Sequence, residues 1–113
     1  MSGITTHVLD TARGRPAAGL AVVLESEEAG AWREIGRGVT DADGRVKSLL
    51  PSGTPLSAGA HRLTFATGPY FAAQHVTAFY PQVTIVFSVS EPTQHHHVPL
   101  LLSPFGYSTY RGS

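Results

Sequence analysis

The stretch Val83-Thr84-Ile85-Val86-Phe87-Ser88-Val89 carries large apolar residues at every odd position, with hydroxyl-bearing residues at two of the even positions. Such a period of two is typical of a β-strand that lays one face on a hydrophobic core. The stretch His61-Arg62-Leu63-Thr64-Phe65 repeats the pattern, so that its odd positions would face the core and its even positions the solvent. These two stretches predict a β-rich fold.

Outside these two stretches, the sequence predicts six more strands, at residues 4–10, 20–25, 32–39, 46–49, 95–103 and 107–112. Twelve Gly and eight Pro separate the short apolar runs, as is typical of strands joined by turns. Eight short strands favour a sandwich or a barrel.

One short helix is predicted between the strands at 61–65 and 83–89. Pro69 is tolerated in the first turn of a helix, residues 70–75 follow it, and Thr67 or Gly68 would cap it. Pro81 prevents the helix from continuing.

Composition limits the classes of protein to which the chain could belong. Its 113 residues, 42% of them hydrophobic, fit one domain spanning residues 1–113. Eight basic residues balance eight acidic ones, which argues against nucleic acid as a partner and is compatible with self-association. The absence of cysteine excludes disulfides, thiolate catalysis and Cys-ligated zinc. No apolar run approaches the ~20 residues of a membrane span, and without a recognisable signal the expected location is cytoplasmic.

Asp41-Ala42-Asp43-Gly44 resembles part of a calcium-binding loop. Aligning Gly44 with the invariant glycine of such a loop puts Val39 and Leu50 at positions that need acidic ligands, so a tight turn is predicted instead. Arg45 follows the turn. It is either a solvated loop charge or a guanidinium that pairs with a carbonyl, an enolate or a carboxylate.

Six histidines are the clearest chemical signal in a chain with few charges. In a strand, His95 and His97 would point to one face and His96 to the other. From the residues alone, three interpretations of these histidines stay open. They are hydrogen-bonded polar residues of a half-buried sheet, groups for catalysis without a metal, or a zinc site completed by His7. No G-x-S-x-G motif is present, so an enzyme would rely on histidine and arginine. These residues suit hydrolysis by water, with imidazole as the base and guanidinium stabilising the oxyanion.

The sequence resembles one known family along essentially its whole length. The residues that carry the resemblance are Thr6-His7-Val8-Leu9-Asp10, Gly14, Pro16-Ala17, Asp43-Gly44-Arg45, Phe79-Tyr80-Pro81, the run from His95 to Pro104, and the ending Tyr110-Arg111-Gly112-Ser113. This pattern is similar to that of the 5-hydroxyisourate hydrolases, the transthyretin-related proteins of urate degradation. The four-residue ending is that family's signature.

The resemblance implies an all-β, immunoglobulin-like (transthyretin-type) sandwich of two four-stranded sheets with one short helix. It implies a homotetramer, arranged as a dimer of dimers, that binds 5-hydroxyisourate at the dimer–dimer interface and needs neither metal nor cofactor. The positions that match the family's catalytic residues are His7, Arg45 and His97, and those expected to bind substrate are Tyr110, Arg111, Gly112, Ser113 and His95.

Two functions are alternatives to hydrolysis of 5-hydroxyisourate without a metal. They are a transthyretin-like carrier of a small molecule, and a zinc-dependent cyclic amide hydrolase using His7, His95 and His97. His61 and His75 are expected to be structural. His96 stands where the resembling family usually has an aromatic residue, commonly tyrosine. Because its side chain alternates away from His95 and His97, we expect it to affect local packing and not catalysis.

Overall fold

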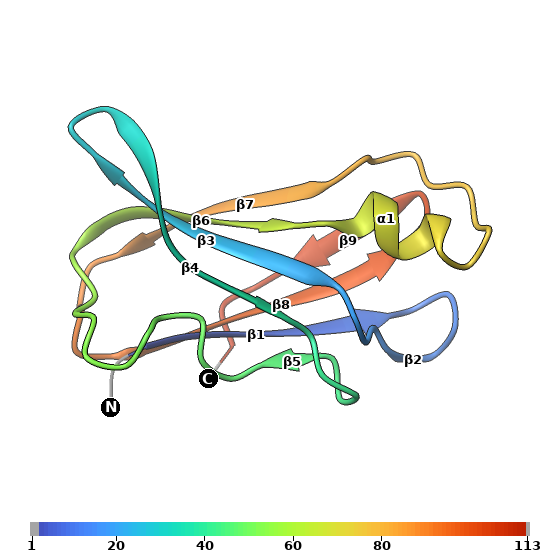
Figure 1. Cartoon of the computed structure of the whole chain (residues 1–113), viewed down its shortest axis with the longest axis horizontal. Coiled ribbons are helices and arrows are strands. Elements are labelled where there is room, and N and C mark those ends of the chain that lie inside the picture. Colours follow the sequence, from blue (N-terminus) through green and yellow to red (C-terminus); the bar gives the residue numbers. More distant parts are fainter. Residues whose placement is uncertain (1–2, 113) are drawn as a thin grey trace.

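The computed structural model describes residues 3–112 and shows two β-sheets packed face to face (Figure 1). One sheet is antiparallel and has four strands in the order β4-β3-β6-β7. Its strands are β3 (Ala21–Glu28), β4 (Ala31–Val39), β6 (Gly59–Phe65) and β7 (Val83–Val89).

The second sheet is built around a parallel pair of strands, β1 and β8, and β9 adds to the outer side of β8. Two short strands, β2 and β5, share the opposite edge of β1, each pairing with a different part of it. The strands are β1 (Gly3–Asp10), β2 (Arg15–Pro16), β5 (Arg45–Val46), β8 (His95–Ser103) and β9 (Gly106–Thr109). The predicted two-sheet sandwich is confirmed, and this sheet has five strands because the edge of β1 is paired in two pieces.

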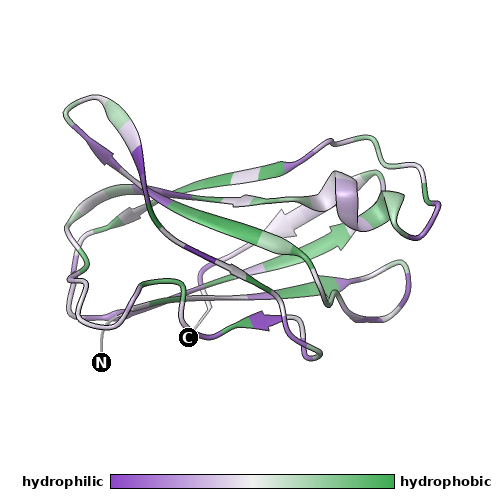
Figure 2. Cartoon of the chain, in the orientation of Figure 1, coloured by the Kyte–Doolittle hydropathy of each residue, from purple (hydrophilic) through white to green (hydrophobic). Residues whose placement is uncertain are grey.

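The core lies between the sheets and follows the alternation predicted from the sequence. In β6 the side chains of His61, Leu63 and Phe65 are fully buried, and in β7 Val83 and Val89 are buried. Figure 2 shows hydrophobic residues concentrated along the middle of strands such as β3. Each fully buried large apolar side chain contributes about 1.5–3 kcal/mol relative to exposure, so the inward faces supply the main driving force for folding.

Two predicted strands extended too far, and one strand was missed. The strand predicted at 46–49 is only Arg45–Val46, because Leu49 enters the core from an irregular segment without strand pairing. The strand predicted at 107–112 ends at Thr109, with a single further bridge at Gly112. The two-residue strand β2 was missed, since so short a segment has no periodicity.

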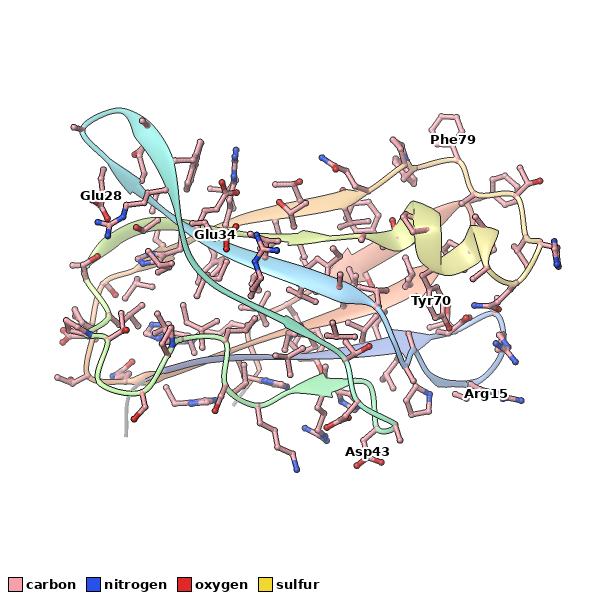
Figure 3. All side chains as sticks on the ribbon, viewed as in Figure 1. Arg15, Glu28, Glu34, Asp43, Tyr70 and Phe79 are labelled. Carbon is pink, nitrogen blue, oxygen red and sulfur yellow. The ribbon has the colours of Figure 1, made fainter. Side chains whose placement is uncertain are left out.

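The helix lies between β6 and β7 as predicted, but its start and end differ. This helix, α1, spans Thr67–Ala72, and the residue before it, Ala66, makes no side-chain capping bond. Thr67 is itself helical and buried. The Tyr70 hydroxyl donates a hydrogen bond to the Asp10 carboxylate at 2.8 Å, joining α1 to the end of β1 (Figure 3). Among the described residues, no helix is long and apolar enough to cross a membrane.

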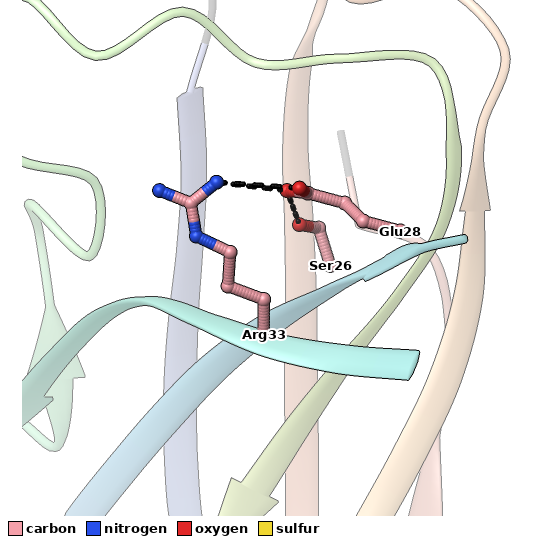
Figure 4. Close-up of polar contacts among 3 residues, drawn as sticks. All are labelled: Ser26, Glu28 and Arg33. Atoms are coloured by element: carbon pink, nitrogen blue, oxygen red, sulfur yellow. Dashed lines mark hydrogen bonds and ion pairs between the residues drawn. The ribbon is translucent and has the colours of Figure 1, made fainter. Parts of the chain in front are cut away.

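The β3–β4 hairpin projects beyond the sandwich (Figure 1). The pairing register shifts at Leu24/Glu25, and such a bulge increases the local twist of a strand pair. Near the tip, both Arg33 and Ser26 donate hydrogen bonds to the Glu28 carboxylate, at 3.2 and 3.1 Å (Figure 4). The Arg33 and Glu28 side chains are 70% and 48% exposed, so their ion pair adds little stability.

Candidate active site

The predicted histidines meet on the outer face of the β1–β8 pair. In β1, Ile4, Thr6 and Val8 are buried, which leaves Thr5 and His7 on the other face. The parallel register puts Thr5 opposite His97. The site face is therefore a consequence of strand alternation in two chain segments some 90 residues apart.

The turn at residues 41–44 delivers Arg45 to the same face. The Asp41 carboxylate accepts hydrogen bonds from the backbone N–H groups of Asp43 and Arg45, at 2.9 and 3.0 Å. Gly44 has φ +77°, and a Cβ there would collide with the Val8 carbonyl. The predicted tight turn is confirmed, and it sets Arg45 opposite His7 in the β1–β5 register.

These residues surround a shallow hollow of about 250 Å³. Its lining consists of Thr5, Thr6, Arg45, Val46, Lys47, His95 and His97. His7 does not line the hollow, but it is near enough for its charge to affect His97. The hollow thus has two imidazoles, two cationic side chains and two threonines, and no acidic residue among its described lining.

His97 is held in its neutral form. Partial burial lowers its pKa, and the nearby positive charge of Arg45 lowers the pKa further, followed by those of His95 and His7. A histidine is uncharged well above its pKa, so His97 has a lone pair available to accept a proton at neutral pH.

The C-terminal segment returns along β8 to His97. The Gly112 N–H donates to the His97 carbonyl at 2.9 Å, and the bridge between these residues continues the register that pairs Leu100 with Thr109. The backbone pairing between β8 and the C-terminal segment is interrupted beside Pro99, because proline has no N–H. There the Thr109 hydroxyl donates a hydrogen bond to the Pro99 carbonyl at 2.7 Å.

The structure brings together only part of the predicted C-terminal set. Gly112 contacts His97 directly, and the exposed Tyr110 lies two positions before it. Arg111 lies apart from this face: its guanidinium donates to the Gln94 side chain at 3.1 Å, and its charge acts on His96. Ser113 is outside the described residues.

The other three histidines lie away from the hollow. His61 is fully buried, with its Nδ1 at 3.0 Å from the Gly59 carbonyl and its ring stacked on Phe87. His96 is 4% exposed and points into the core, as its alternation from His95 and His97 predicts. His75 is exposed just after α1, with φ 58°.

Sequence reasoning missed Thr5. Its hydroxyl oxygen lies 2.8 Å from Nε2 of His95 and 2.8 Å from Nδ1 of His97. The available signal was its position two residues before His7, since residues i and i+2 of a strand share a face.

The zinc alternative is not favoured by the ligand geometry. Within residues 3–112, no three His, Asp, Glu or Cys side chains are grouped closely enough to hold a metal ion. His95 and His97 instead turn ring nitrogens toward the same threonine hydroxyl.

Comparison with known proteins agrees with this architecture. The chain is 47% identical over 117 residues to the 5-hydroxyisourate hydrolase of Caulobacter vibrioides, covering all of both chains. The solved structure of Klebsiella pneumoniae 5-hydroxyisourate hydrolase superimposes with a TM-score of 0.86 at 38% identity, covering 99% of this chain and 100% of that one.

Sea bream transthyretin in complex with thyroxine gives a TM-score of 0.88 at 35% identity, covering 96% of this chain and 93% of that one. The fold is therefore shared by a hydrolase and a protein that binds thyroxine. The model of the HIUase/Transthyretin family matches residues 4–112, so the chain belongs to the HIUase/Transthyretin family.

Proposed function

We propose that this protein hydrolyses 5-hydroxyisourate to 2-oxo-4-hydroxy-4-carboxy-5-ureidoimidazoline in urate degradation, with water activated by histidine and without a metal. The observation that carries the proposal is the hollow that gathers His95, His97 and Arg45, in a chain 47% identical to a 5-hydroxyisourate hydrolase. Residues 1–113 would form one catalytic domain.

In the proposed reaction, His7 or His97 takes a proton from water, whose oxygen attacks the C6 carbonyl carbon of the substrate. The C6–N1 bond then breaks, the electron pair goes to N1, and N1 receives a proton from the other histidine or from the newly formed imidazolium. The depressed pKa of His97 supports its role as the base, because a general base must be unprotonated at the working pH.

Arg45 would bind the planar substrate and stabilise the negative oxygen that forms on C6. A guanidinium presents several N–H donors in one plane, which matches carbonyl and ureide oxygens. Stabilisation of an oxyanion by a fixed donor is worth about 10²–10³-fold in rate. His95, Tyr110, Arg111, Gly112 and Ser113 would shape the substrate pocket.

The proposed assembly is a homotetramer, a dimer of dimers, with the substrate at the dimer–dimer interface. Exposed apolar side chains on the edge strand β7 and around β9 support self-association, notably Val86 (60% exposed), Phe105 (69%) and Tyr107 (42%). Multi-angle light scattering of the purified protein would test the tetramer. The cytoplasmic location stays a prediction, and cell fractionation would test it.

The decisive assay generates 5-hydroxyisourate with urate oxidase and follows its absorbance with and without this protein. The substrate also decays spontaneously, so the expected result is decay faster than the blank in proportion to protein concentration. Decay at the blank rate would refute the proposal. Undiminished activity after treatment with a chelator is the expected outcome for hydrolysis without a metal.

A carrier of a small hydrophobic molecule is the second candidate function, favoured by the likeness to sea bream transthyretin bound to thyroxine. Fold alone does not decide between the two. The cationic and imidazole-rich lining of the hollow favours hydrolysis, because an apolar ligand would leave these polar groups without partners. Tight binding in a thyroxine titration, together with no acceleration of 5-hydroxyisourate decay, would reverse the order.

A further inference from the structure

Thr5 lies between two imidazoles of the candidate site. Its hydroxyl oxygen lies 2.8 Å from His95 Nε2 and 2.8 Å from His97 Nδ1. A hydroxyl has one proton to donate but accepts up to two hydrogen bonds. When both rings are neutral, Thr5 can therefore donate to His97 and accept from His95, donate to His95 and accept from His97, or accept from both rings.

These arrangements differ in what His97 can do. If Thr5 donates to Nδ1 of His97, the neutral ring carries its proton on Nε2 and has no lone pair left for water. If Nδ1–H of His97 donates to Thr5, Nε2 is unprotonated and can accept a proton. The resulting imidazolium keeps the same Nδ1–H bond, so only an arrangement in which Thr5 accepts from His97 suits a base.

A catalytic histidine is commonly oriented by a carboxylate or a carbonyl that accepts its second N–H. The described lining of the hollow contains no acidic residue, and the basic groups that act on His97 are Arg45, His95 and His7. The groups beside the His97 ring that can take this part both belong to Thr5. Its hydroxyl lies 2.8 Å from Nδ1, and a hydrogen bond with its backbone opposes the effect of burial on the pKa of His97.

We propose that Thr5 is a positioning residue whose hydroxyl accepts the Nδ1–H of His97 and so fixes the tautomer that leaves Nε2 free to take a proton. The role in catalysis rests on the proposed hydrolysis, whereas the tautomer does not.

Two substitutions separate the effect of the Thr5 hydroxyl from the effect of the rest of the side chain. Thr5→Val keeps the shape and the β-propensity but removes the hydroxyl, and Thr5→Ser keeps the hydroxyl. We expect Thr5→Val to lower kcat about 10–100-fold, within the range for a misplaced catalytic group, with KM nearly unchanged. Thr5→Ser should restore most of kcat.

Thr64→Val is the matched control. Thr64 lies on β6 of the other sheet, and its hydroxyl lies 3.3 Å from that of Thr84. Both kcat and the tautomer of His97 should equal those of the wild type.

Imidazole ¹⁵N NMR at neutral pH reads the tautomer directly, without substrate. The expected result is a proton on Nδ1 of His97 in the wild type and in Thr5→Ser, and a shift toward the Nε2–H form in Thr5→Val. This result would support the positioning role even if the protein did not hydrolyse 5-hydroxyisourate. An unchanged tautomer in Thr5→Val, or an unchanged kcat in an active Thr5→Val enzyme, would overturn the proposal.

Discussion

The imidazole of His97 lies directly over the Cα of Gly112. A Cβ built on Gly112 would come within 2.6 Å of Cδ2 of His97, closer than real side-chain contacts allow. The same two residues are joined by the hydrogen bond from the Gly112 N–H to the His97 carbonyl. The glycine near the chain end is therefore the surface against which the ring of His97 rests.

Replacing Gly112 with alanine should displace the ring or the C-terminal segment. Because displacement of a catalytic group by about 1 Å costs on the order of 100-fold in rate, we expect Gly112→Ala to lower kcat by about 10–100-fold. Gly106→Ala is the control, since a Cβ there meets only the Ser103 hydroxyl, at 3.8 Å. Equal kcat in the two variants, measured by 5-hydroxyisourate decay, would show that the contact with Gly112 does not hold the ring.

Removing either candidate base should slow the chemical step. His7→Asn and His97→Asn are each expected to lower kcat about 10²–10⁴-fold, the usual contribution of general acid–base catalysis. The folded state should survive, because both side chains lie on the outer face of the sheet and are only partly buried. Steady-state kinetics together with circular dichroism would check this, and near-normal rates in both variants would refute the assignment.

The C-terminal segment should matter for activity more than for assembly. Deleting residues 110–113 removes the hydrogen bond to the His97 carbonyl but leaves β9 complete, since that strand ends at Thr109. We expect most activity to be lost while size-exclusion chromatography shows the wild-type oligomer. A short tag added after Ser113 should have the same effect.

Two other outcomes of deleting residues 110–113 would contradict this prediction. Full activity in the deletion variant would refute a role in the pocket. A change of oligomeric state would instead favour a segment that completes the sheet edge and seals the assembly.

His96 should make the folded state sensitive to acid. Burial lowers the pKa of His96, and the positive charge of Arg111 lowers it further. The unfolded chain, with a histidine pKa of about 6.5, then binds the proton more readily than the folded chain. Stability should be full above about pH 6.5 and decline as the pH falls toward the depressed pKa of the native state.

Urea unfolding at pH 5 and pH 7.5 measures this effect. In His96→Phe, which restores an aromatic ring, the loss of unfolding free energy between the two pH values should be smaller than in the wild type. His75→Asn serves as the control, because His75 is exposed and asparagine tolerates its positive φ. An equal loss in His96→Phe and the wild type would contradict the assignment.

The sequence by itself determined the all-β class and most strands, because one buried face imposes a period of two that 83–89 and 61–65 display. It also predicted that His95 and His97 share a face and that His96 points away, since alternation within one strand is a local property. The turn before Arg45 was readable too, as Asp and Gly have local reasons to occupy it.

Only the tertiary structure decided which distant residues meet. The parallel register of β1 and β8 brings Thr5 beside His97, and no local pattern encodes the register between segments 92 residues apart. The two-piece edge of β1 and the single bridge at Gly112 likewise arise from pairing with neighbours. Strand alternation is fixed by backbone geometry within a segment, whereas register is fixed by how the faces of different segments pack together.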